Sequence, residues 1–156
     1  MKFYSLTTTV LSYKWVILIA LLFSILNGQA QDGNATDNNL IGSWTLNLSS
    51  SMAGMALEDK ESLDASPEVK NKIFQRFSNR TLVFDANGNF SQSDGLGNQM
   101  SGTWNLQGQT LVVTSPTGNQ WVQQIIQLSR DQLVLQQQSK GIATPIFPQL
   151  YLTKNQ

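Results

Sequence analysis

The sequence predicts an all-β fold: an eight-stranded up-and-down antiparallel barrel with one amphipathic helix inserted after the first strand. After residue 79, apolar and polar residues alternate in short segments that turn residues separate at short intervals. The motif Gly-x-Trp-x-Leu occurs at 42–46 and again at 102–106. Because a spacing of two is the side-chain period of a strand, the three residues of each copy share one face. A sheet of eight short strands tends to close, since closure removes its exposed edges.

The N-terminus predicts a signal peptide over residues 1–30. Lys2 and Lys14 precede an apolar run over 15–23, and small residues near position 30 provide a cleavage site. The run is short for a bilayer span, which needs about 20 apolar residues. An uncleaved membrane tether is the alternative. We therefore expect export to the periplasm or secretion, with membrane contact only through this segment before cleavage.

Composition narrows the classes of function. The chain carries 10 Lys+Arg and 10 Asp+Glu without a run of like charges, which argues against nucleic acid as a partner. Cysteine and histidine are absent, which removes disulfides, the commonest general base and the commonest metal ligand. No cofactor and no metal site are therefore expected, and the protein is not expected to be an enzyme. The sequence indicates no particular protein partner.

Residues 31–39 predict a disordered linker, and residues 40–154 predict the barrel domain. The linker is rich in Asn and Asp and almost free of apolar side chains. Apolar residues then alternate with others from Leu40 to Leu48, which predicts the first strand. The three serines that follow end this strand.

A helix is predicted over 67–77. A serine N-cap followed by Pro67 is typical of a helix start. Val69, Ile73 and Phe77 recur every fourth residue and form an apolar stripe, while the charged residues between them face water. The helix is therefore expected to be amphipathic and to pack on the barrel.

The segment between the first strand and this helix is less regular. Met52, Met55, Leu57 and Leu63 are interleaved with acidic residues. Since methionine adapts to varied partners, these residues could form a lid over an open barrel mouth. Simple packing that plugs the barrel end is the alternative. The acidic residues lack the spacing of a calcium loop and are better explained by the nearby helix start.

Seven further strands are predicted after Asn79, joined mostly by tight turns. They span 81–84, 89–92, 100–106, 110–114, 120–128, 133–136 and 147–153. Alternation predicts an inward group of Leu82, Phe84, Met100, Leu106, Leu133 and Leu135. In the strand over 120–128, either Trp121 with Ile125 or Val122 with Ile126 faces inward. Residues 85–89 begin like a calcium loop, but a hairpin turn explains them better.

Four short segments, 40–44, 82–90, 101–106 and 128–135, together resemble a bacterial lipocalin-like domain of the calycin-like β-barrels. The resemblance covers most of residues 40–154. It implies a barrel that can hold a small apolar ligand. Better-known lipocalins carry an arginine near the last strand that packs on the first tryptophan, whereas the last strand here offers only Lys154.

The candidate site residues fall into three groups. Candidate barrel-lining, ligand-binding residues are Phe84, Phe90, Met100, Trp104, Trp121 and Tyr151. The candidate lid residues are Met52, Met55 and Leu57. Gly42, Trp44 and Gly102 are expected to be structural. For Trp104, packing in a filled core is favoured over a role in lining a ligand pocket.

The leading hypothesis is an exported, non-catalytic binding protein that holds a small apolar or amphipathic ligand in its barrel. The alternative is a protein- or glycan-interaction module of the cell envelope with a filled barrel core. That alternative predicts an exposed apolar or aromatic patch, which could include Trp121 or Phe147.

Overall fold

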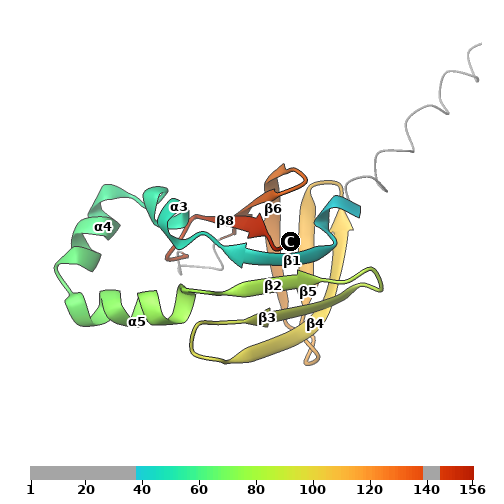
Figure 1. Cartoon of the computed structure of the whole chain (residues 1–156), viewed down its shortest axis with the longest axis horizontal. Coiled ribbons are helices and arrows are strands. Elements are labelled where there is room, and N and C mark those ends of the chain that lie inside the picture. Colours follow the sequence, from blue (N-terminus) through green and yellow to red (C-terminus); the bar gives the residue numbers. More distant parts are fainter. Residues whose placement is uncertain (1–37, 139–144) are drawn as a thin grey trace, which may run out of the picture. The chain divides into compact units, whose positions relative to one another are not determined.

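Eight antiparallel strands close into one barrel in sequence order, and β8 returns to pair with β1 (Figure 1). The computed structural model describes residues 38–138 and 145–156. The predicted signal peptide and most of the predicted linker lie outside the described residues. The strands are β1 Gly42–Leu46, β2 Thr81–Phe84, β3 Asn89–Ser93, β4 Gln99–Gln107, β5 Thr110–Thr114, β6 Gln120–Leu128, β7 Gln132–Gln137 and β8 Gln149–Lys154. The predicted fold class is confirmed.

Three helices lie between β1 and β2, where the sequence predicted one. They are α3 Leu48–Ala53, α4 Leu57–Asp64 and α5 Pro67–Phe77. The predicted helix over 67–77 is α5. The first strand is shorter than predicted because Asn47 caps α3, accepting a hydrogen bond from the backbone N–H of Ser50 at 3.0 Å. Leu48 therefore begins a helix instead of ending a strand.

A buried serine fastens α3 to β8. The Ser51 side chain is fully buried, and its Oγ donates to the Asn47 carbonyl oxygen at 2.9 Å. The same Oγ accepts from the backbone N–H of Tyr151 at 3.0 Å. By contrast, α5 has no buried residue, and Leu63 is the one buried residue of α4. The helices thus differ in how firmly they are packed.

In an up-and-down barrel, alternate connections lie at the same end. The β1–β2 connection with its helices therefore shares one end with the β3–β4, β5–β6 and β7–β8 connections. We call this the helix end, and Figure 1 shows α4 and α5 extending beyond the strands there. The other end, which the β2–β3, β4–β5 and β6–β7 turns share, is called the closed end.

Apolar side chains fill the inner side of the barrel. The buried core includes Trp44, Leu46, Leu82, Phe84, Phe90, Leu111, Val113, Ile125, Leu133, Leu135, Leu150 and Leu152. The inward prediction is confirmed for Leu82, Phe84, Leu133 and Leu135, while Met100 and Leu106 pack half-buried against the core. On β6, Ile125 is buried and Ile126 is 50% exposed, so the Trp121–Ile125 face is the inner one.

Three hairpin turns share one hydrogen-bonded pattern of five residues, at 85–89, 94–98 and 115–119. In each, the first residue pairs with the fifth through backbone, and its side-chain oxygen accepts from the fifth residue's N–H. The hydrogen bond from the Asn89 side chain to Asp85 is the main cause that lowers the pKa of that carboxyl. The Asp85 carboxylate therefore accepts hydrogen bonds from within its own turn. Within the described ranges, no group of three or more His, Cys, Asp or Glu residues could hold a metal ion.

Candidate ligand-binding site

Trp44 seals the closed end of the barrel. Its side chain is fully buried, and its indole N–H donates to the Leu40 carbonyl oxygen at 2.8 Å. The Nζ of Lys154 lies 5.0 Å from the centroid of the Trp44 ring and donates to the Asn39 carbonyl oxygen at 3.1 Å. The segment before β1 and the end of β8 therefore close over the same ring.

The glycines of the two Gly-x-Trp motifs make room for neighbouring chain. A Cβ at Gly42 would lie 2.5 Å from Cε of Lys154, and the backbone there has φ of +138°. A Cβ at Gly102 would lie 2.2 Å from the carbonyl oxygen of Thr114 on β5. These close approaches fit the structural role predicted for both glycines.

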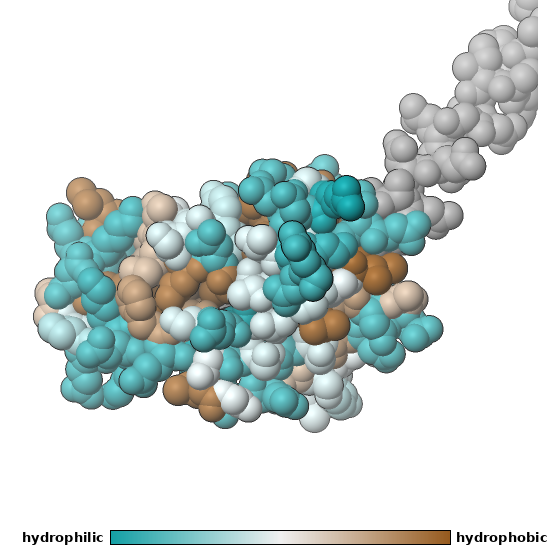
Figure 2. Space-filling view, viewed as in Figure 1, coloured by the Kyte–Doolittle hydropathy of each residue, from teal (hydrophilic) through white to brown (hydrophobic). Residues whose placement is uncertain are grey.

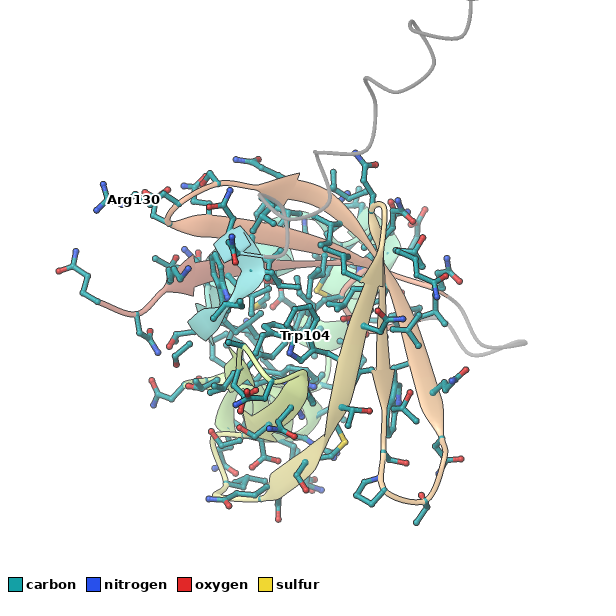
Figure 3. All side chains as sticks on the ribbon, turned by 90° about the vertical axis from the view of Figure 1, so that its right-hand side faces the viewer. Trp104 and Arg130 are labelled. Carbon is teal, nitrogen blue, oxygen red and sulfur yellow. The ribbon has the colours of Figure 1, made fainter. Side chains whose placement is uncertain are left out.

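An aromatic cluster continues the filled region inward from the closed end. The indole N–H of Trp104 donates to the Asp85 carbonyl oxygen at 3.0 Å, and its ring meets Phe84 edge-on at 5.8 Å. Phe84 in turn lies 5.3 Å from Phe90. Figure 3 shows Trp104 among the side chains inside the ring of strands, whereas Arg130 extends away from them. Three predicted lining residues thus pack against one another on the inner side.

The inner wall becomes polar toward the helix end. Directly paired residues share a face, so Gln92 lies on the inner side with Leu82, and Gln123 lies there with Leu111. Gln137 is the register partner of Gln123 and donates from Nε2 to the Phe147 carbonyl oxygen at 2.9 Å. Toward the helices, the inner side of the barrel therefore carries glutamine side chains among the apolar ones.

Two predicted lining residues belong to this polar part of the wall. Met100 is the register partner of Gln92 and is half-buried. Trp121 pairs with the buried Val113 and is 42% exposed, so its ring sits at the rim of the barrel rather than deep within it.

Tyr151 does not line the barrel, which corrects its prediction as a ligand-binding residue. Its neighbours Leu150 and Leu152 are buried on the inner side, so Tyr151 lies on the outer face of β8. Its hydroxyl donates to Oε1 of Gln149 at 2.9 Å. A large aromatic side chain suggested a lining role, but the alternation of β8 decides its direction.

Helices and the segment before β8 cover the helix end. Met55 is buried in the core cluster and Met52 packs half-buried against it. Phe77 of α5 meets the fully buried Phe147 edge-on at 4.9 Å. Leu57, the third predicted lid residue, is 67% exposed and lies outside this cluster. Apolar periodicity did not predict that Phe77 and Phe147 would form the cover.

Arg80, which no sequence pattern singled out, lies at the same end. Its Nη2 donates to Oε1 of Gln92 at 2.6 Å, and its guanidinium carbon is 5.1 Å from the centroid of the Phe77 ring. Its Nε is buried without a hydrogen-bond partner. Extending the alternation of Leu82 and Phe84 by one step would have placed position 80 on the inner side.

Three hollows lie outside the barrel interior. One, of about 550 Å³, is on the outer face of β2 to β5, and its polar lining includes Asn89, Ser91, Ser101, Thr103, Thr114 and Ser115. A second, of about 300 Å³, lies between α4, α5 and residues 145–146. A third, of about 280 Å³, lies along β2 to β4. On the inner side of the barrel, buried apolar side chains pack against one another.

The surface is mostly polar with separate apolar areas, as the visible face in Figure 2 shows. The exposed large apolar residues are Leu57, Val69, Phe74, Leu96, Trp121, Ile126 and Ile146. Phe147, suggested as part of an exposed patch, is instead buried. None of the helices in the described part of the chain is long and apolar enough to cross a membrane.

Comparison with known families agrees with this geometry. A family model described as a lipocalin-like domain matches residues 26–135. The match includes β1, the three helices and the strands as far as β7. Comparisons with curated proteins and with solved structures found no match. With more than half of its length matched, the chain belongs to the lipocalin-like domain family.

Proposed function

We propose that this protein is an exported, non-catalytic binding protein that takes a small apolar or amphipathic ligand through the helix end of its barrel. The lipocalin-like barrel is a ligand-binding fold, and its family is generally non-catalytic. One observation carries the proposal: the inner wall is aliphatic and aromatic near Trp44 but carries Gln92, Gln123 and the rim residue Trp121 near the helices. Apolar burial with a few orienting polar groups is the usual design of a small-molecule site.

The light packing of the cover supports entry from this end. Ile73 and Phe77 of α5 pack against the core only half-buried, and Leu63 is the one buried residue of α4, so these helices bury less apolar surface than the core strands. Segments with little buried apolar surface open at a lower free energy than core strands. In the proposal, a ligand displaces the contact between Phe77 and Phe147 and occupies the space that the cover fills.

The test is a ligand titration of the full chain, monitored by tryptophan fluorescence and native mass spectrometry. Binding at the helix end should shift the emission of Trp121 to the blue and reduce its quenching by acrylamide. Trp121→Phe should remove most of this signal. Ile126→Ala, which changes an exposed residue on the outer face of the same strand, should leave it intact. Saturable binding that does not involve Trp121, or a screen of apolar and amphipathic compounds without any binder, contradicts the proposal.

Export rests on the N-terminal pattern alone. Lys2 and Lys14 before the apolar run support a signal peptide over 1–30, with 31–39 as linker and 40–154 as the mature barrel domain. Expression in a secreting host followed by N-terminal sequencing of the exported chain tests this. A chain that still begins at Met1 contradicts it.

A second candidate function is favoured by the hollow on the outer face of β2 to β5. Its hydroxyl and amide lining suits a glycan or a polar protein segment, as expected of an envelope interaction module. Ser101→Arg would fill this hollow, while Asn105→Arg adds the same charge on the same strand outside it. If soluble oligosaccharides such as chitotriose bind and only Ser101→Arg abolishes binding, this second function replaces the first.

A further inference from the structure

We propose that Arg80 is the anion-binding group at the helix end of the barrel. The ligand is then an amphiphile with an acidic headgroup such as a carboxylate, sulfonate or phosphate. This inference rests on the proposed function and specifies its ligand class. Three features of Arg80 point to this ligand class: the position of its guanidinium, its few hydrogen-bond partners among the described residues, and the side chains around it.

Arg80 enters the barrel from the start of β2. Its carbonyl oxygen accepts from the backbone N–H of Leu46 at 2.8 Å, which fixes its backbone against β1. Its position continues the inward alternation of Leu82 and Phe84. The side chain therefore extends along the inner wall toward Gln92, at the end that the helices cover.

The guanidinium has fewer partners than it can bind. Of its five N–H donors, one reaches Gln92 at 2.6 Å, and the buried Nε donates to nothing in the described structure. Among residues 38–138 and 145–156, no carboxylate lies within 4.0 Å of an Arg80 nitrogen. The nearby Asp94 instead lies 3.8 Å from Nε of Arg76 and is occupied by its own turn. Among the described residues, none provides a direct counter-ion for this positive charge at the helix end.

Such an arrangement is costly unless an anion completes it. Burial, together with the charge of Arg76, lowers the pKa of Arg80, and Asp94 acts in the opposite direction. A desolvated guanidinium favours a planar acidic group that can accept two parallel hydrogen bonds. The ring of Phe77, 5.1 Å from the guanidinium carbon, contributes a cation–π contact but accepts no hydrogen bond.

The surroundings indicate an amphiphile rather than a free ion. Phe77 of the cover contacts both the guanidinium and Phe147. Met100 and Trp121 lie on the inner wall at this end. An acidic headgroup at Arg80 would therefore place its apolar tail among these side chains. An isolated inorganic anion would leave that apolar surface without a partner.

The experiment compares two fluorescent probes with the same ring system in the full chain. One is 1-anilinonaphthalene-8-sulfonate, which is anionic, and the other is neutral N-phenyl-1-naphthylamine. Arg80→Gln should weaken sulfonate binding about 10-fold or more, since a charge-assisted hydrogen bond contributes at least that factor. Binding of the neutral probe should stay within about twofold. Arg76→Gln removes the same charge from an exposed neighbour and should change neither probe.

Two measurements keep the result independent of whether Arg80→Gln folds well. Arg80→Lys keeps the charge and should retain a preference for the sulfonate, though weaker because the fork is lost. In the wild-type protein, added salt should weaken the sulfonate but not the neutral probe. The role of Arg80 is overturned if Arg80→Gln weakens both probes equally, or if the wild-type protein binds the sulfonate no more tightly than the neutral probe. In either case the barrel still stands as a binding site. Failure of both probes to bind the wild type overturns the proposed function itself.

Displacement of the sulfonate probe by competitors distinguishes an acidic amphiphile from a neutral amphiphile and from a free inorganic anion. Decanoate and decyl phosphate should displace it, whereas decanol should compete only weakly and inorganic phosphate should not compete. Displacement by inorganic phosphate at the same concentration would overturn the assignment of an amphiphile. Equal competition by decanol and decanoate would overturn the anion site.

Discussion

Lys154 and Trp44 are register partners across the seam between β8 and β1, and the lysine Nζ lies 5.0 Å from the centroid of the indole ring. The lysine stem reaches this position because Gly42 has no Cβ to obstruct it. The same Nζ then donates to the Asn39 carbonyl oxygen. A lysine thus takes the place in which better-known lipocalins carry an arginine over the first tryptophan.

We expect Lys154→Met to lower the free energy of unfolding by about 0.5–2 kcal/mol, because it keeps the stem but removes the charge over the ring. Lys154→Arg should retain most of the stability. The exposed Lys72→Met is the control and should change stability by less than about 0.5 kcal/mol. Urea unfolding measures all three; equal effects of Lys154→Met and Lys72→Met would show that the contact contributes nothing.

Trp44→Ala should cost about 3–5 kcal/mol, since it empties a fully buried site at the closed end. Trp44→Phe keeps a ring but loses the hydrogen bond to the Leu40 carbonyl oxygen, and should cost less. Chemical denaturation with fluorescence or circular dichroism measures the difference. An unchanged melting temperature of Trp44→Ala would refute the structural role of this residue.

Gly102→Ala should destabilise the barrel by about 1–3 kcal/mol, because the added Cβ would meet the Thr114 carbonyl oxygen at 2.2 Å and force β4 and β5 apart. Gly54→Ala is a matched control. Its φ is −80°, and its nearest non-neighbour atom would be 3.7 Å away, so it should be neutral or slightly stabilising. Similar losses in both variants would mean that the close strand approach does not explain the glycine.

The free energy of unfolding should decrease in acid, because Asp85 and Asp94 lose turn-stabilising hydrogen bonds when their carboxylates are protonated. Hydrogen bonds from Asn89 and Asn98 lower the pKa of Asp85 and Asp94 below their ordinary value of 3.8. Carboxyls with a lowered folded pKa stabilise the fold above the unfolded value, and this contribution is lost as pH falls through the folded pKa. Urea unfolding between about pH 6 and pH 2 should therefore show a loss that Asp85→Ser, which copies the serine of the 115–119 turn, reduces. An identical acid profile in that variant contradicts the prediction.

The amide hydrogens of α5 should exchange with solvent faster than those of β4 and β7. The reason is that α5 has no buried residue, whereas β7 contains Leu133, Val134 and Leu135 in a buried run. Hydrogen exchange followed by mass spectrometry measures this. Protection of α5 equal to that of β7 would mean that the cover does not open independently of the barrel.

Alternation predicted most of the strands because each buries one face. It failed where a local interaction overrode it: Asn47 caps a helix, so Leu48 left the strand pattern. The helix α5 was predicted because Pro67 and its apolar stripe are signals within the helix itself. In α4 the apolar residues form no such stripe, and Leu63 is its one buried residue, so tertiary contact rather than periodicity defines that helix.

The candidate site was only partly predictable from the sequence. The inner-side position of Phe84, Phe90 and Trp104 was predictable because alternation places these aromatic residues on the inward face of their strands. Tyr151 was predicted on the wrong face because its aromatic side chain suggested a lining role, whereas the buried Leu150 and Leu152 on either side place it on the outer face of β8. Arg80 was missed because it precedes β2 and belongs to no apolar pattern. Its side chain bonds Gln92, which only the pairing of β2 with β3 brings near.

The seam between β1 and β8 also governs how the ring comes together. Every other strand pair joins neighbours in sequence, and three of their turns are stabilised by the same five-residue pattern. The seam joins residues as distant as Thr45 and Asn155, which are 110 positions apart. Local hairpins form faster than such remote pairs, so the meander can assemble before its two outer strands meet. Until they meet, both strands present open hydrogen-bonding edges to other chains, and aggregation competes with this last step.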